Sequence, residues 1–594
     1  MTMYPLTVLL PLFVGGIAAL AMGVSPKSER YAKYVALAGA LGSALLTVLL
    51  LVHAAPLPSQ IAWFSAGGYS FHLELSFTSA NQLLLLLIAV ISPLIFLYSV
   101  GYMDVPSEQS RYYFLMSLFA VSMTLLAMSG GFLTFFIAWE GLGITSYLLI
   151  GFWYHKEAPP LAARKAITTI LVGDICLLAG MLMIWSIFHT FSFAAIISGA
   201  HALATIPTII IAAGVLLLVG AFTKSAQFPF HEWLSDAMEG PTPVSAFLHS
   251  STMVKAGVFL AILLIPLFIE LKLLWLMLVI GAITVLVGAV TALASDHIKK
   301  ILAYSTMEDL GLMFVALGLN AIPAALLFFA VQAIYKALLL MSSGTIMKAN
   351  GDDVNIYRVS SFGRNRLLFI SALIGALSLA GLFPFSGFFG KVAIDSAAVS
   401  NVTVYVVLTV ADFLTALYIF RWLFVPMGNQ RRAPRSLIIA KFATMKRSMQ
   451  APQAILAAGV LAFTAYLFIN GNFAVNLAAA SIETAVVVFG MLAAYIMFKK
   501  TTSMLSERSR ARLLMHTSYP VNAAYNLLAA SVIGIARGAE AFERYLNRVL
   551  YAGARGVVGL GSSTKVAENG NVNTYVAALA VGLVIVLLLL ILVP

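Results

Sequence analysis

Long runs of apolar residues, separated by short polar loops, recur along most of this chain. A helix needs about 20 apolar residues to cross the hydrocarbon core of a bilayer. About sixteen stretches satisfy this length, over residues 4–24, 31–54, 81–101, 112–128, 131–153, 165–189, 207–228, 243–268, 273–294, 301–319, 322–347, 366–388, 397–424, 452–471, 479–498 and 573–593. The pattern predicts an all-α polytopic membrane protein.

The pattern changes after residue 498. Residues 499–570 are basic and only moderately apolar, and 521–555 alternates apolar blocks with charged residues. This is typical of an amphipathic helix that lies along a membrane surface or a partner. The alternative is an ordinary cytoplasmic linker, and Pro520 and Gly534 argue against one unbroken rod. Residues 571–594 follow as an anchoring transmembrane helix.

Composition supports a lipid environment. Of the 594 residues, 61% are hydrophobic and 10% are charged, whereas soluble proteins carry roughly 25% charged residues. A soluble enzyme, a nucleic-acid-binding protein and a disordered scaffold are therefore excluded. The only cysteine is Cys176, and an iron–sulfur cluster needs about four cysteines. His231 and Glu232 are adjacent rather than spaced as a metal-binding H-E-x-x-H motif. We expect no catalytic site, cofactor or metal in this chain.

The net charge of +12 mainly reports topology. Basic residues occupy the odd-numbered loops, whereas the even-numbered loops 55–80, 190–206, 319–322 and 471–478 contain no Lys or Arg. Because positive residues collect on the cytoplasmic side, we expect a multi-pass protein of the cell membrane. Its N-terminus would lie outside, and residues 499–570 would lie on the cytoplasmic side.

Several ionisable residues lie inside the apolar stretches, where each is costly unless it faces protein or water. They are Glu140, Asp174, Lys224, His249, Lys255 and Lys336, and Lys391 follows the twelfth stretch. Carboxylates and lysines on neighbouring helices suit a relay of protons or cations, because each changes the protonation of the other. The alternatives are snorkelling for Lys255 and Lys391, a structural ion pair for Asp174, and a hydrogen-bonded histidine at a helix crossing for His249.

Two helices contain a Phe-Pro-Phe sequence, at Pro229 and Pro384, and proline breaks or kinks a helix. They are the seventh and twelfth predicted helices. Because these two are five helices apart, an odd number, they cross the membrane in opposite directions. Proline-interrupted helices in corresponding positions of two halves indicate an inverted repeat. We expect helices 4–8 (111–268) and 9–13 (269–425) to form the two repeats, with three helices before them (1–110) and two after them (426–498).

Three motifs carry a resemblance to a known family: WEGLGITSYLLIGFWY, GAFTKSAQFPFHEWLSDAMEGPTPVSAFLHSSTMVKAGVFL and KKILAYSTM. They resemble the antiporter-like, proton-translocating membrane subunits of respiratory complex I, which have relatives in cation/proton antiporters, membrane-bound hydrogenases and archaeal complexes. The layout of 499–594 looks like the distal subunit, subunit L, with its lateral helix and anchoring helix.

The resemblance implies roles for individual residues. Glu140 and Lys224 would form the pair of one half-channel, with Asp174 tuning the lysine. The remaining positions are His249 as a connecting group, Lys255, Lys300 in the tenth-helix basic motif, Lys336 as the central lysine and Lys391 as the exit lysine.

The chain departs from the subunit L pattern at its centre. Gln332 replaces a histidine, Val392 replaces the acidic neighbour of Lys391, and Glu308 with Asp309 replaces a neutral polar pair. Whether Glu308 and Asp309 take over from the missing groups is left open at this point.

The expected function is proton pumping through this relay, driven by electron transfer in partner subunits. Those partners would be other antiporter-like subunits and a peripheral arm carrying flavin and iron–sulfur clusters, so that this chain is a non-catalytic subunit of an NADH-quinone oxidoreductase-like complex. The alternative is a cation/proton antiporter subunit independent of redox chemistry. Coupling of a proton current to inorganic carbon uptake does not require the tail, and a purely structural brace does not explain lysines in apolar helices.

Overall fold

The computed structural model describes residues 5–53, 59–103, 108–360, 365–429, 445–470 and 476–498, together with Arg548 and Val581. The chain divides into two compact units, Met1–Ser518 and Tyr519–Pro594, and every element below belongs to the first. The predicted lateral helix over 499–570 and the anchoring helix over 571–594 lie outside the described residues, apart from these two positions.

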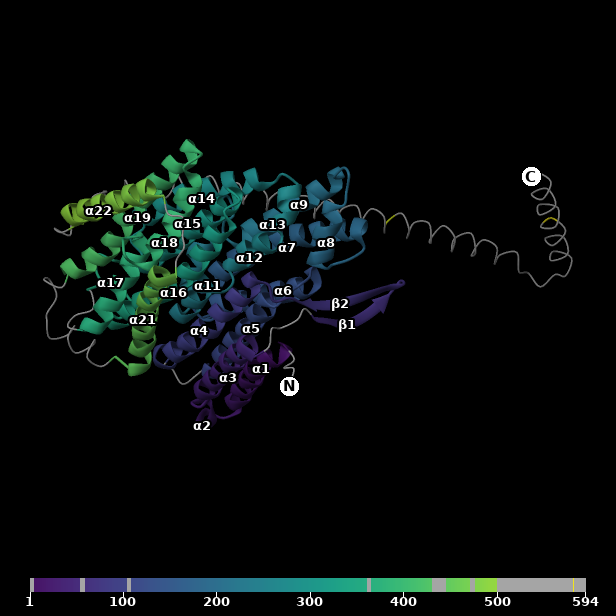
Figure 1. Cartoon of the computed structure of the whole chain (residues 1–594). Coiled ribbons are helices and arrows are strands. Elements are labelled where there is room, and N and C mark those ends of the chain that lie inside the picture. Colours follow the sequence, from purple (N-terminus) through teal and green to yellow (C-terminus); the bar gives the residue numbers. More distant parts are fainter. Residues whose placement is uncertain are drawn as a thin grey trace. The chain divides into compact units, whose positions relative to one another are not determined.

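The described part is mostly helical, and thirteen of its helices are long and apolar enough to cross a membrane (Figure 1). The first half contains η1 (Pro5–Leu9), α1 (Leu10–Ala21), η2 (Met22–Val24), α2 (Pro26–Glu29), α3 (Ala32–His53), α4 (Ser79–Tyr102), α5 (Gln109–Ala127), α6 (Phe132–Ile150), α7 (Ala158–Phe188), α8 (Phe193–His201), α9 (Thr208–Lys224), α10 (Glu232–Asp236) and η3 (Ala237–Glu239). The second half contains α11 (Thr242–Ser250), α12 (Lys255–Leu263), α13 (Ile265–Glu270), α14 (Leu274–Ala294), α15 (Ile298–Gly318), α16 (Ile322–Ala349), α17 (Arg366–Ala380), α18 (Ser386–Ala398), α19 (Val402–Asn429), α21 (Arg447–Asn470) and α22 (Leu477–Phe498).

The two proline-containing helices are broken, as predicted. After α9 ends at Lys224, the chain passes through Pro229 before α10 begins. The second break contains Pro384 and separates α17 from α18. The predicted end of this second helix at residue 388 was wrong, because α18 continues to Ala398. Lys391 therefore lies within the broken helix and not after it.

A third break interrupts the stretch over 243–268, which we predicted as one helix. Residues 251–254 separate α11 from α12. The Thr252 hydroxyl donates to the carbonyl of Phe247, and the Ser225 hydroxyl donates to the carbonyl of Val254 at 2.8 Å. Hydroxyl side chains offer the backbone an alternative to helical hydrogen bonds, which explains a break without proline.

Residues 59–75, predicted as part of a loop, form a β-hairpin of β1 (Ser59–Ala66) and β2 (Tyr69–Leu75). The strands are antiparallel, with Ser59 opposite Leu75 and Ala66 opposite Tyr69. Gly67 and Gly68 form the turn with φ of 59° and 82°, and two consecutive residues of positive φ give the tight turn that twisted hairpins prefer. The Gly-Gly pair was the sequence signal for this element.

Even-numbered loops meet at one end of the bundle. The amide of Gly130 donates to Glu74 of the hairpin at 2.9 Å, and the amide of Phe193 donates to Gly130 at 3.1 Å. His201 and Glu270 form a pair at 2.9 Å.

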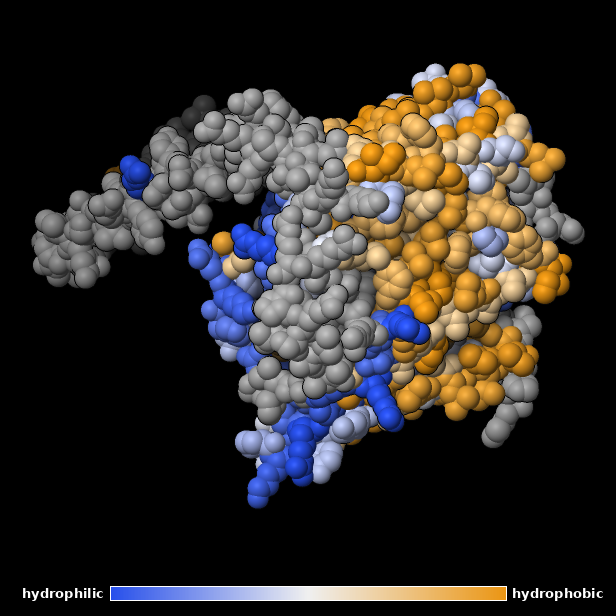
Figure 2. Space-filling model, turned by 90° about the vertical axis from the view of Figure 1, so that its left-hand side faces the viewer, coloured by the Kyte–Doolittle hydropathy of each residue, from blue (hydrophilic) through white to orange (hydrophobic). Residues whose placement is uncertain are grey.

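Apolar side chains cover a broad part of the surface, with hydrophilic residues gathered along an edge (Figure 2).

The backbones of α14 and α15 are in direct contact. A Cβ on Gly281 would lie 2.8 Å from the carbonyl oxygen of Gly311, and a Cβ on Gly311 would lie 2.9 Å from that of Gly281. A Cβ on Gly318 would lie 2.6 Å from the amide nitrogen of Leu278. Small residues allow this approach between helices in lipid, and they hold α15 in a fixed register against α14.

Candidate functional site

Lys224, the last residue of α9, is fully buried beside Asp174 of α7. Its Nζ lies 3.4 Å from Asp174 Oδ1 and 4.6 Å from the ring centroid of Trp139. The indole Nε1 of Trp139 donates to the same Asp174 oxygen. The ion-pair partner of Lys224 is therefore Asp174.

Glu140 follows Trp139 on α6 and is only partly buried. Adjacent helical residues point about 100° apart, so Glu140 faces a different direction from the indole that contacts Asp174. Within the described ranges, no ion pair joins Glu140 to Lys224. Glu140 and Lys224 are therefore not in direct contact, because Asp174 occupies the contact position beside the lysine.

His249 and Lys255 lie on either side of the third helix break and are fully buried. The Lys255 ammonium donates to the carbonyl of Phe329 on α16 and lies 4.3 Å from the centroid of its ring. Gln332, one turn further along α16, donates to the carbonyl of His249 at 3.3 Å. Lys255 ends inside the protein, so it does not snorkel. Neither ring nitrogen of His249 has a hydrogen-bond partner among the described residues.

Lys336 occupies the middle of α16 and contacts α15. Its Nζ lies 2.8 Å from Asp309 Oδ2 and donates to the Ser305 hydroxyl at 2.7 Å. Asp309 therefore supplies the carboxylate for the central lysine. The sequence left open whether Glu308 and Asp309 take over from the missing groups, because both lie in one helix and sequence alone does not show which of them faces α16.

Glu308 points instead towards α19. Its carboxylate accepts hydrogen bonds from the Thr415 and Tyr418 hydroxyls, the latter at 2.8 Å. Asp412 lies three residues before Thr415 and thus on the same face of α19. This face leads from Glu308 to Lys391.

Lys391 on α18 is 2% exposed, and its Nζ lies 2.7 Å from Asp412 Oδ1. Snorkelling is excluded here also. The acidic partner that Val392 does not provide comes from another helix. Sequence reasoning missed Asp412, Asp395 and Glu483. The rule that singled out the other charges in apolar helices applies to Asp412 and Glu483, whereas Asp395 lies between the predicted stretches 366–388 and 397–424.

Lys300 lies apart from these buried groups. Its side chain is 26% exposed and pairs with Asp236 at 3.6 Å and Glu239 at 3.7 Å. The buried member of the basic motif is Lys299, whose ammonium donates to the carbonyls of Met238 and Gly240. Sequence alone did not distinguish the two adjacent lysines.

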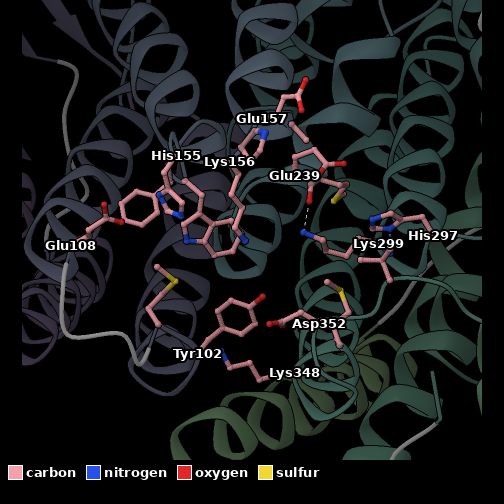
Figure 3. Close-up of a pocket in the computed structure, with 18 of the residues that line it drawn as sticks. Tyr102, Glu108, His155, Lys156, Glu157, Glu239, His297, Lys299, Lys348 and Asp352 are labelled. Carbon is pink, nitrogen blue, oxygen red and sulfur yellow. Dashed lines mark hydrogen bonds between the residues drawn. The ribbon is translucent and has the colours of Figure 1, made fainter. Parts of the chain in front are cut away.

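Five odd-numbered loops surround one cavity of about 890 Å³ (Figure 3). Its lining residues include Glu108, His155, Lys156, Glu239, His297, Lys299, Lys348 and Asp352. The loops that the charge pattern assigned to one side therefore do meet on one face. Charged side chains from each of these loops line the cavity, and Lys299 lies at its wall.

His297 caps the start of α15 at this cavity. Its Nδ1 accepts from the amides of Lys299 and Lys300 at 3.1 Å and 3.3 Å. Burial, and then the nearby Lys299 and Lys300 ammonium groups, lower the pKa of His297 to about 3 from its usual 6.5.

We expect the stability contributed by neutral His297 to be complete above pH 6.5, and to decline as the pH falls towards 3. His297→Asn keeps an N-cap and removes the titration. Between about pH 7.5 and pH 5, the thermal midpoint of the detergent-solubilised variant should then drop less than that of the wild type. The difference should correspond to a free energy of unfolding on the order of 1 kcal/mol. An equal drop in both proteins would contradict this assignment.

A chain of contacts links the buried charges. Ser225, next to Lys224, contacts Val254 beside Lys255, and Lys255 contacts the helix of Lys336. Asp309 and Glu308 connect Lys336 to α19, where Asp412 holds Lys391. Three buried Lys–Asp pairs are thus arranged in succession, joined by polar groups.

Two family descriptions match the chain. Residues 129–417 match NADH:quinone oxidoreductase/Mrp antiporter, TM. Residues 63–114 match NADH-Ubiquinone oxidoreductase (complex I), chain 5 N-terminus. The first match contains all three Lys–Asp pairs.

Known proteins are similar over much of their length. NADH-quinone oxidoreductase subunit L of Campylobacter jejuni is 35% identical over 415 residues, covering 69% of this chain and 69% of that protein. The Escherichia coli subunit L is 34% identical over 437 residues, or 72% and 71%. The Mycobacterium tuberculosis subunit L is 40% identical over 343 residues, or 57% and 53%.

Two solved structures share the fold. A chain of the Mrp complex from a Dietzia species has a TM-score of 0.71 at 22% identity; the match covers 99% of this chain and 63% of that one. A chain of the membrane-bound sulfane sulfur reductase, an archaeal respiratory membrane complex, has a TM-score of 0.68 at 21% identity, with 82% and 99% covered.

Proposed function

Because this chain belongs to the NADH:quinone oxidoreductase/Mrp antiporter family of membrane subunits, we propose that it is a proton-translocating membrane-arm subunit of a complex I-like respiratory oxidoreductase. It is a multi-pass membrane protein with relatives named subunit L. The observation that carries the proposal is the succession of three buried pairs: Lys224–Asp174, Lys336–Asp309 and Lys391–Asp412.

The pairs suit stepwise proton transfer. A buried ammonium is costly without a partner, so a lysine that loses its carboxylate tends to release its proton. In the proposed path, protons reach Lys224 with help from Glu140 and Asp174 and pass His249 and Lys255 to Lys336. Asp309 and Glu308 then lead to Lys391, from which the proton leaves.

The finer architecture is part of the proposal. Residues 111–268 and 269–425 would be the inverted repeats of a sixteen-helix protein, which the corresponding breaks at Pro229 and Pro384 support. The N-terminus would lie outside, and the lateral helix over 499–570 would lie on the cytoplasmic side, which the distribution of basic residues supports.

The proposed partners are of two kinds. We propose that other antiporter-like subunits lie beside this chain, in agreement with the multi-subunit complexes that share its fold. A peripheral redox arm with flavin and iron–sulfur clusters would supply the energy, since one cysteine cannot hold such a cluster here.

Purification of the complex in mild detergent, followed by identification of the co-migrating subunits, tests this assignment. Redox subunits should co-migrate with the chain. Recovery with antiporter subunits alone would favour the redox-independent cation/proton antiporter and would contradict the respiratory function.

Neutralising the first pair tests the path. We expect Lys224→Met to reduce proton pumping by at least roughly tenfold, as for loss of a group that carries the proton. Glu140→Gln should reduce pumping less, since it does not contact the lysine directly. Dye-monitored acidification of inverted vesicles containing the assembled complex measures both, and undiminished pumping in both variants would remove these residues from the path.

A further inference from the structure

Three acidic side chains meet beside the break between α17 and α18. They are Asp395 of α18, Asp412 of α19 and Glu483 of α22, which are 5%, 4% and 3% exposed. One carboxylate oxygen from each lies within 4.8 Å of those of the other two. Three helices thus bring their acidic groups to one buried point.

The positive charge in contact with this cluster balances only part of it. Lys391 pairs with Asp412, whereas neither oxygen of Glu483 has a hydrogen-bond partner in the described part of the chain. A buried carboxylate without a partner is costly. An unpartnered acid that faces two further acids indicates that a positively charged ligand belongs there.

The geometry suits a metal cation. An ion between three oxygens at most 4.8 Å apart would lie no more than about 2.8 Å (4.8 Å/√3) from each, close to the roughly 2.3–2.6 Å at which a hard cation such as Ca²⁺ binds oxygen.

The end of α17 adds to the negative potential. A Cβ on Gly381, which terminates this helix, would lie 2.6 Å from Glu483 Oε1 and 2.8 Å from Cδ of Lys391. The C-terminal end of a helix carries partial negative charge, and interrupted helices use such ends to bind cations. Glu483 and Lys391 therefore face the same helix terminus.

We propose that Asp395, Asp412 and Glu483 form a binding site for a monovalent metal cation such as Na⁺. The Lys391 ammonium competes with this cation for the site. A monovalent ion is favoured because its single charge equals that of the one proton that Lys391 can release. Loss of a proton from Lys391 and entry of one Na⁺ leave the total charge unchanged, so the site exchanges one for the other. This deepens the translocation path proposed above, but binding is measurable without pumping.

The test is equilibrium binding of ²²Na⁺ to the purified complex at fixed pH. We expect saturable binding that Glu483→Gln and Asp395→Asn weaken at least roughly tenfold, because the charge and number of ligands set cation affinity. Lys391→Met should instead strengthen binding, since it removes the competitor. That opposite sign separates loss of a ligand from loss of the fold.

Glu270→Gln is the matched control, because Glu270 is an acid of the same chain that pairs with His201 away from the cluster. It should bind ²²Na⁺ like the wild type. Absence of saturable binding, equal binding by Glu483→Gln and wild type, or weaker binding by Lys391→Met would each overturn the cation site. Proton pumping by the same samples reports separately on the translocation function.

Discussion

Replacing Lys336 with methionine should abolish most proton pumping and also destabilise the protein. The substitution removes the central ammonium and leaves Asp309 buried without its partner at 2.8 Å. Breaking a buried ion pair from one side costs about 3–5 kcal/mol. Pumping should fall at least roughly tenfold, because the substituted group carries the proton.

The double variant Lys336→Met with Asp309→Asn separates the two effects. It removes both charges, so the thermal midpoint of the solubilised complex should recover most of what the single variant loses. Pumping into inverted vesicles should remain low. Recovery of pumping in the double variant would show that this pair stabilises the fold without carrying protons.

Replacing Gly387 with alanine should strongly disturb the second helix break. A Cβ at this position would lie 1.6 Å from the carbonyl oxygen of Ser378, so α18 must move away from α17. The Gly387 amide would then lose its hydrogen bond to the Ser378 hydroxyl. We expect a destabilisation at or above the upper end of the about 1–3 kcal/mol typical of overpacking, together with loss of pumping because Lys391 moves with α18.

Gly459→Ala is the matched control. Gly459 lies inside α21, and the nearest atom to an added Cβ is Ile334 Cγ2 at 3.8 Å, an ordinary contact. Alanine should therefore be neutral or stabilise by about 0.5–1 kcal/mol. The measurements are the thermal midpoint and the proton pumping of each variant. Similar midpoints for the two variants would contradict the close packing at Gly387.

Sequence was sufficient for features with a local signal. Runs of apolar residues predicted the long helices of the described part of the chain, and Pro229 and Pro384 predicted two breaks, because each signal lies within the segment that it describes. The hairpin had such a signal in Gly67 and Gly68, and we missed it. The break after Ser250 had a weaker one, since hydroxyl residues also occur within intact helices.

Pairing depends on how helices cross, which no local pattern reveals. Sequence identified Asp174 and Lys224 as buried charges, but the expected partner was Glu140, and only the packing of α7 against α9 places Asp174 in contact. Likewise, the position next to Lys391 is Val392 and not an acid, and Lys391 pairs with Asp412 of α19. The carboxylate that pairs with Lys391 comes from a different helix, because an ion pair requires two groups to be close in the fold and not in the sequence.

The close contact between α14 and α15 limits how the central pair can change state. Because the Gly281 and Gly311 backbones already touch, α15 cannot slide or rotate without a steric clash, so Asp309 has a nearly stationary backbone. Separation of Asp309 from Lys336 must then come from side-chain rotation or from movement of α16. A pair of distance probes on α15 and α16 would therefore report this movement. The distance between probes on α14 and α15 would stay constant.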